Sequence, residues 1–162
     1  MSKTLIVMRH AKSSWEHAGP DIERPLNKRG RDSAVALGDW LRARDLAPDE
    51  ILCSAATRTQ ETAQRLKLAA PVSLNKALYM APAESLLKYT QRATGDTVLI
   101  LAHNPGIGEF AERLTRIAPN HPRFFDYPSG ATTVFSCDIE EWRELAFDSA
   151  APTDFVVPRE LI

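Results

Sequence analysis

The sequence has few cysteines, no excess of charge of one sign and no long apolar run. It contains 2 cysteines, and its 20 Lys and Arg against 21 Asp and Glu give a net charge of -1. Each of these facts excludes some classes of protein function. Balanced charge argues against the basic surface that binds a nucleic-acid backbone, so we expect no nucleic-acid partner. Two widely separated cysteines rule out a disulfide framework, and we expect Cys53 and Cys137 to be buried free thiols.

Signals for export or for a membrane are also missing. The apolar run near the N-terminus ends at charged Arg9, and the run at residues 98–102 is far shorter than the roughly 20 residues that a membrane-spanning helix needs. We therefore expect a cytoplasmic protein with no membrane partner. No Cys, His or carboxylate cluster has metal-ligand spacing, which predicts a protein without a metal or another cofactor.

Short apolar runs alternate with helical patterns along the 162 residues. Strands are predicted at residues 5–8, 50–53, 97–102 and 132–137, and helices at 28–44, 55–66, 82–92 and from Asn104-Pro105 onward. This alternation predicts one domain over residues 1–162, a three-layer α/β/α sandwich with a mostly parallel central sheet. The tail after Ser149 is predicted to be irregular.

Histidines and arginines follow three of the predicted strands directly. Arg9 and His10 follow the first strand, Arg58 lies just after the second, and His103 follows the third. Arg24 lies on the first long loop. Because the carboxyl ends of parallel strands meet at one edge of a sheet, we expect these side chains to converge.

Such a cluster suits a phosphoryl group. Arginine offers a planar fork of donors that matches phosphate oxygens, and a helix that begins near Asn104 adds backbone N–H groups. The arginines also disfavour protonation of a nearby imidazole, which leaves it neutral and nucleophilic near pH 7. Phosphoryl transfer asks mainly for positioning and charge neutralisation, so these residues predict a metal-independent phosphoryl-transfer site.

Three segments resemble the histidine phosphatase superfamily. They are Arg9-His10-Ala11 after the first strand, residues 54–63 after the second and residues 102–105 after the third. The similarity covers residues 4–135 and points most to the short SixA-like branch, which is named for a phosphohistidine phosphatase. It implies a phosphoglycerate mutase-like fold.

The resemblance also implies roles by position. His10 would be the phosphorylated nucleophile, Arg9 and Arg58 would hold the phosphoryl oxygens, and His103 would stabilise the transferring group. Arg24 matches a further arginine of the SixA-like branch. We predict that Arg24 and Asn104 bind substrate.

The sequence departs from the family at two points. Ala11 replaces the usual glycine after the nucleophile, and no residue securely matches the general acid that many members use. Glu84 is the nearest candidate acid, although a glutamate in the first turn of a helix also has a purely structural explanation; Asp21 is a weaker candidate. Because an imidazole can leave as a neutral group, a missing acid favours phosphohistidine as the substrate.

The predicted substrate is therefore a phosphorylated protein, for example a histidine phosphotransfer domain. A phosphomonoesterase acting on a small phosphorylated metabolite is the alternative within the same chemistry. Two alternatives of other classes remain: a phosphate-binding interaction module without turnover, and an NAD-binding oxidoreductase suggested by the glycine pattern Gly106-x-Gly108-x-x-Ala111.

A group of basic residues lies close to the predicted site along the chain. Lys12 follows His10 by two positions, and Lys28, Arg29 and Arg31 crowd the start of a predicted helix, where positive charge is mildly unfavourable. They form either an ordinary solvated rim or a surface that attracts anionic substrates.

Overall fold

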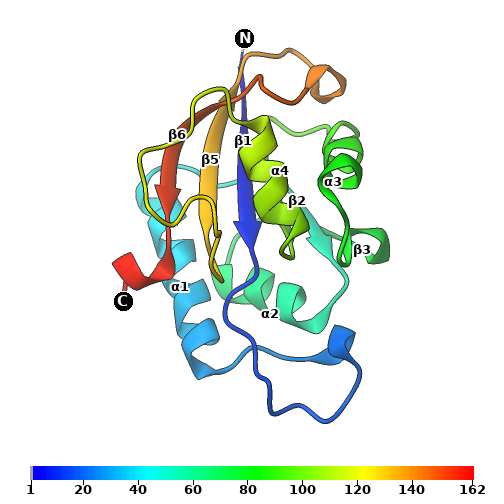
Figure 1. Cartoon of the computed structure of the whole chain (residues 1–162), viewed down its shortest axis with the longest axis vertical. Helices are drawn as coiled ribbons and strands as arrows, with labels where there is room; N and C mark the ends of the chain where they lie inside the picture. The colour runs from blue at the N-terminus through cyan, green and yellow to red at the C-terminus, as the bar shows by residue number, and fades with distance from the viewer. Residues whose placement is uncertain (1) are drawn as a thin grey trace.

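The computed structural model describes residues 2–162, which build a central six-stranded sheet with helices on both sides (Figure 1). The strands are β1 (Lys3–Arg9), β2 (Glu50–Ser54), β3 (Val72–Asn75), β4 (Thr97–Ala102), β5 (Thr132–Cys137) and β6 (Ala151–Val156). The helices are α1 (Lys28–Ala43), α2 (Thr57–Leu66), α3 (Ala83–Thr90) and α4 (Gly106–Leu114), with the short 3-10 helices η1 (Asp21–Glu23), η2 (Lys76–Leu78), η3 (Trp142–Glu144) and η4 (Pro158–Glu160).

The sheet is mostly parallel, as predicted. Its strand order is β3-β2-β4-β1-β5-β6. Strands β1, β2, β3 and β4 pair in parallel, whereas β5 is antiparallel to both β1 and β6. Strand β1 is therefore central, and its carboxyl end lies between β4 and the beginning of β5.

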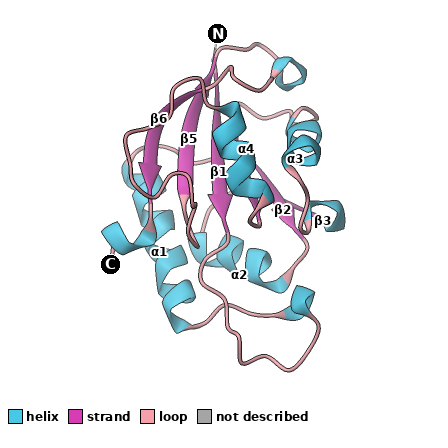
Figure 2. Ribbon diagram, viewed as in Figure 1, coloured by secondary structure: helices cyan, strands magenta, loops and turns pink. Residues whose placement is uncertain are grey.

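Side chains of β1 alternate between two apolar clusters, one on each face of the sheet. Leu5 and Val7 pack with residues of α3 and α4, and Ile6 and Met8 pack with residues of α1 and α2. Figure 2 shows α4 on the viewer's side of β1. A strand that buries both faces needs this continuous apolar run, and the three-layer architecture is confirmed.

Two edge strands, β3 and β6, were not predicted from the sequence. The prediction of an irregular tail after Ser149 was wrong, because residues 151–156 form β6 on one edge of the sheet. Pro152 argued against a strand at these residues. An edge strand tolerates a proline, however, because one side of it makes no ladder hydrogen bonds. Strand β3 is short and mostly exposed at the other edge, so it lacks a buried apolar pattern.

Other local expectations have clear outcomes. Asn27 caps α1, with its Oδ1 accepting a hydrogen bond from the backbone N–H of Gly30 at 2.8 Å. Helix α4 begins at Gly106, one residue later than predicted, with Pro105 at the capping position. Cys53 and Cys137 are buried free thiols, as predicted. Within residues 2–162, no helix combines the length and the apolar character that crossing a bilayer requires.

Candidate active site

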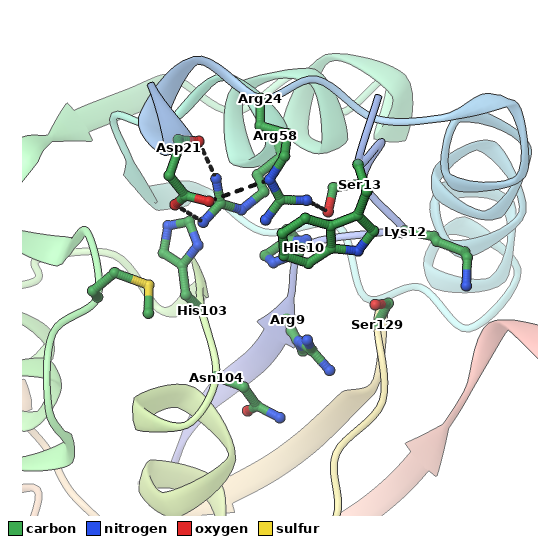
Figure 3. A pocket seen from close by; sticks show the side chains of 12 residues that line it. Arg9, His10, Lys12, Ser13, Asp21, Arg24, Arg58, His103, Asn104 and Ser129 are labelled. Carbon is green, nitrogen blue, oxygen red and sulfur yellow. Dashed lines mark hydrogen bonds and ion pairs between the residues drawn. The ribbon is translucent and has the colours of Figure 1, made fainter. Parts of the chain in front are cut away.

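A pocket of about 280 Å³ lies where β1, β2 and β4 end, and all the residues predicted as catalytic and substrate-binding line it (Figure 3). These residues are Arg9, His10, Arg24, Arg58, His103 and Asn104. The ring centroids of His10 and His103 are 5.3 Å apart. The structure therefore brings together two imidazoles and three guanidiniums that are far apart in the chain.

The backbone of His10 is held by both neighbours of β1. Its N–H donates to the carbonyl of Ala102 at 3.1 Å, and its carbonyl accepts from the N–H of Gly130 at 2.8 Å. The side chain is 5% exposed, and its Nδ1 lies 2.7 Å from the carbonyl oxygen of Ala11. Because a carbonyl can only accept, Nδ1 carries the proton, and the lone pair of the neutral ring is on Nε2.

Ala11 fits without a glycine at this position. The residue is fully buried and packs with Leu26 and Ala34, and its backbone N–H donates to Oγ1 of Thr62 on α2 at 3.1 Å. Its methyl group thus fills space between α1 and the loop that follows β1. This departure from the family pattern leaves the carbonyl that orients His10 in place.

Both pocket imidazoles are neutral over a wide pH range. Burial, partly offset by the hydrogen bond to Ala11 and reinforced by His103, Arg9 and Arg58, lowers the pKa of His10 to about 3. Burial and then Arg58 lower the pKa of His103 to about 3 as well, against the opposing effect of Asp21. The direction expected from the sequence is confirmed, but burial contributes more than the arginines do.

Ser54 orients the ring of His103. Its Oγ lies 2.7 Å from Nε2 of His103 and accepts from the backbone N–H of Ala56 at 3.3 Å. A serine hydroxyl can donate to Nε2 or accept from it, so this contact holds the ring in place. The other ring nitrogen, Nδ1, is buried and has no hydrogen-bond partner within residues 2–162.

Two arginine nitrogens share this condition. Nε of Arg9 and Nε of Arg58 are also buried without a partner in the described part of the chain. Nη1 of Arg9 donates to the carbonyl of Tyr127 at 3.1 Å, and both Nη atoms of Arg58 donate to Asp21. Two guanidiniums and two neutral imidazoles that line one pocket form a site suited to a tetrahedral oxyanion.

Asp21 is the anion of this network, although the sequence indicated it only as a weaker candidate for the general acid. Its carboxylate accepts from Nη2 of Arg58 at 3.0 Å, from Nε of Arg24 at 3.2 Å and from the hydroxyl of Tyr79 at 2.5 Å. The bond from Tyr79, followed by that from Arg58, lowers the pKa of Asp21 to about 2. Asp21 is therefore ionised near neutral pH and positions the arginines instead of donating a proton.

Glu84 lies outside the pocket. It occupies the first turn of α3, its side chain is 63% exposed, and it forms an ion pair with Arg113 at 3.2 Å. A backbone hydrogen bond and then Arg113 lower its pKa. The structure thus contradicts the general-acid prediction for Glu84 and supports the structural explanation.

Arg24 and Asn104 line the pocket with most of their polar atoms already engaged. Arg24 donates to the Ser13 hydroxyl and to Asp21, and its guanidinium stacks 3.7 Å from the ring centre of Trp15. Asn104 donates to the carbonyl of Tyr127 at 3.0 Å and accepts from the N–H of Gly108 at 3.1 Å. Asn104 thus holds the start of α4 against the loop that precedes β5.

The glycines of the apparent dinucleotide pattern serve protein packing. A Cβ on Gly106 would lie 1.8 Å from the carbonyl oxygen of Ala81, and one on Gly108 would lie 2.8 Å from Oδ1 of Asn104. Close packing of the chain therefore explains both glycines, so the pattern gives no separate support to the oxidoreductase alternative. Within residues 2–162, no three His, Cys, Asp or Glu side chains are placed to hold a metal ion together.

Comparisons with known proteins agree with this geometry. The model of the histidine phosphatase superfamily, branch 1, matches residues 5–79. An uncharacterised protein of Mycobacterium leprae is 33% identical over an alignment of 162 positions, gaps included. The alignment covers 94% of this chain and 100% of the relative. A solved structure from Nakamurella multipartitia, provisionally assigned as the phosphohistidine phosphatase SixA, superposes with a TM-score of 0.88 at 28% identity, covering 98% of this chain and 97% of that chain.

Proposed function

This chain belongs to the histidine phosphatase superfamily, and we propose that it hydrolyses phosphohistidine on a protein through a phosphorylated His10. Phosphatase activity follows from the family. The protein substrate, the metal-independent mechanism and the residue roles are our proposal. The observation that carries it is that Arg9, Arg58 and His103 line one pocket with His10, whose ring centre lies 5.3 Å from that of His103.

In the first step, the Nε2 lone pair of His10 forms a bond to phosphorus while the bond from phosphorus to the leaving atom breaks. The leaving group takes that electron pair, and Arg9, Arg58 and His103 bind the phosphoryl oxygens as charge shifts onto them. His10 now carries its phosphoryl group on Nε2 and its proton on Nδ1, and the Ala11 carbonyl stabilises the resulting positive ring.

In the second step, water attacks phosphorus from the side that the leaving group vacated. The P–N bond breaks, its electron pair returns to Nε2, the proton of the water passes to a phosphate oxygen, and inorganic phosphate leaves. His103 contributes its Nδ1–H to the phosphoryl oxygens in both steps. A base of unusually low pKa such as His10 is also a good leaving group, which favours rapid breakdown of the phosphoenzyme.

The state of the pocket carboxylate supports phosphohistidine as the substrate. A phosphate ester expels an alkoxide and gains much from a proton donor, but Asp21 is ionised and Glu84 lies outside the pocket. The imidazole of phosphohistidine is protonated by solvent near neutral pH and leaves as a neutral ring.

A comparison of three substrates tests the proposal. We expect faster turnover of a phosphohistidine-bearing phosphotransfer domain than of a sugar phosphate, with an aryl phosphate also cleaved because its phenolate leaves easily. Chelator should change none of these rates. Preference for the sugar phosphate would assign a metabolite phosphomonoesterase instead, and loss of activity with chelator would refute the metal-independent mechanism.

The nucleophile is tested separately by His10→Ala. This variant should lose at least about a thousandfold in kcat, a magnitude typical for removal of a covalent nucleophile, while its circular dichroism stays native. Rapid acid-free quenching with labelled substrate should trap phosphoenzyme in the wild type and none in the variant. Anion binding by the wild type without any turnover would mark the protein as a binding module.

A further inference from the structure

A second hollow adjoins the catalytic pocket, and basic side chains surround it. It has a similar size, about 280 Å³, and we call it the basic hollow. Its polar lining residues are Lys12, Arg29, Ser33, Arg123, Ser129 and Arg159. Lys12 and Ser129 line both cavities, so the two are adjacent. In Figure 3 the Lys12 side chain extends away from His103 and Asp21.

The charge of the basic hollow is one-sided. Four cationic side chains line it, and none of its described lining residues is acidic. Arg123 is partly neutralised by Asp126, with its Nε 3.0 Å from the carboxylate. Within residues 2–162, Lys12, Arg29 and Arg159 form no ion pair. Converging cations repel one another, and a bound anion would relieve that repulsion.

Among residues 2–162, the Arg29 side chain forms no ion pair with any carboxylate. It lies in the first turn of α1, which contains no acidic residue, so the helix dipole disfavours its charge. Its basic neighbours are engaged: Lys28 pairs with Asp32 at 2.8 Å, and Arg31 donates to the carbonyl of Leu26 at 3.3 Å. Arg29 instead lines the hollow, where its positive charge would attract a bound anion.

The backbone around the hollow is fixed relative to the nucleophile. The first turn of α1 packs on the loop after β1 so closely that a Cβ on Gly30 would lie 1.9 Å from the carbonyl oxygen of Lys12. On the other side, a Cβ on Gly130 would lie 2.5 Å from Cγ of Pro158, the residue before Arg159. Gly130 also donates to the carbonyl of His10, so both walls are tied to the catalytic segment.

We propose that the basic hollow binds a second anionic group, a carboxylate or a phosphate, of the same substrate molecule that presents its phosphoryl group to His10. The inference rests on the proposed phosphatase function and narrows its substrate class. It favours a phosphohistidine with an acidic side chain nearby on the protein surface. A small molecule with two phosphates has the same chemistry and is separated from it by the test.

The test uses the double variant Arg29→Gln/Arg159→Gln, because both residues are exposed and line only the basic hollow. Each compound is measured as a competitor of aryl phosphate hydrolysis, which works whether or not the compound is itself cleaved. The compounds are a phosphohistidine peptide with flanking Asp and Glu, the same peptide with Asn and Gln, an alkyl bisphosphonate and an alkyl monophosphonate. Arg116→Gln/Arg143→Gln removes the same charge from exposed sites outside both cavities.

In the wild type, the acidic peptide should compete more strongly than its amide counterpart. The double variant should weaken competition by the acidic peptide at least about fivefold, as expected for two partly exposed ion pairs, and leave aryl phosphate kcat/KM and the amide peptide unchanged. A loss confined to the bisphosphonate would assign the hollow to a second phosphate instead.

Two results would overturn the inference: equal weakening of every competitor, or no weakening of either compound that carries two anionic groups. The control pair should behave as the wild type, and an equal effect in it would reduce the hollow to general charge attraction. If the wild type hydrolyses neither aryl phosphate nor a phosphohistidine-bearing domain, the phosphatase function fails, which is a different outcome from failure of the basic hollow.

Discussion

Ser54 and Asp21 bind the residues that we expect to contact the phosphoryl group, and each sets the state of its neighbour. We expect the serine hydroxyl to donate to Nε2 of His103 and so keep the ring proton on Nδ1, and the carboxylate fixes the direction of the Arg58 guanidinium. Both effects are positional, because catalysis of phosphoryl transfer depends on donors that are already aimed at the developing charge.

Replacing Ser54 by Ala should lower kcat on aryl phosphate about tenfold, as is typical when one oriented hydrogen bond to a catalytic group is lost. Without the hydroxyl, the buried His103 ring can place its proton on Nε2 and turn an acceptor toward the phosphoryl oxygens. Nitrogen-15 NMR of the imidazole should show the Nδ1–H tautomer in the wild type and a mixture in the variant. An unchanged tautomer with reduced kcat would contradict this role.

The residues that the sequence identified share one property. Arg9, His10 and His103 lie at the carboxyl ends of parallel strands, and Arg58 lies in the first turn of the helix that follows β2, so topology brings them together. Ser54 ends β2 and could have been found by the same reasoning. Asp21 and Tyr79 lie on irregular segments whose paths depend on tertiary packing, and the only sequence signal was an acid three residues before Arg24.

At the scale of elements, α1 matters beyond its buried apolar face. Its first turn sets the position of Lys12 and supplies Arg29 to the basic hollow, and Asn27 caps it. The backbone N–H of Asn27 also donates to the carbonyl of Lys12 at 3.1 Å. The beginning of this helix therefore connects the fold to the segment that carries the nucleophile.

Asn27→Ala should reduce the free energy of unfolding by about 1 kcal/mol, because the Gly30 N–H loses its acceptor. The matched variant Asn27→Asp should keep the cap and be at least as stable as the wild type, since an acid there offsets the basic first turn and suits the helix dipole. Urea unfolding of the three proteins measures this. If the Asp variant lost as much stability as the Ala variant, the capping explanation would be wrong.

The central elements were predictable and the edge elements were not, for a physical reason. Strands β1 and β4 are buried on both faces and therefore carry continuous apolar runs. Strand β6 has one side free of partners, so its sequence can alternate polar residues and include Pro152. It nevertheless leads into η4 and thus to Arg159, which explains why the sequence predicted only Lys12 and Arg29 of the basic hollow as basic residues near the site.

At the scale of the whole molecule, the two neutral imidazoles make stability depend on pH. In the unfolded chain a histidine has a pKa of about 6.5, whereas the pKa values of His10 and His103 in the fold are lowered to about 3. Between these values the unfolded state binds protons that the folded state does not. Stability is therefore fully present above pH 6.5 and falls as the pH drops toward 3.

We expect the free energy of unfolding to decrease between pH 6 and pH 5 by on the order of 1 kcal/mol for each of these histidines. Urea titrations at a series of pH values measure the slope. His10→Asn should remove about half of the contribution that the pair makes, because one of the two groups is gone. The same slope in the variant and the wild type would show that His10 is not held neutral by the fold.

The hydrogen bonds on either side of His10 have one more consequence. Residue 10 continues the sheet pairing at the end of β1, between Ala102 and Gly130, although its side chain already faces the pocket. The segment that carries His10 is therefore already in place before an anion binds, and it does not have to become ordered on binding. Calorimetry of phosphate or vanadate binding should accordingly show a small heat-capacity change. The donors lose their conformational freedom when the chain folds, so anion binding does not have to order them.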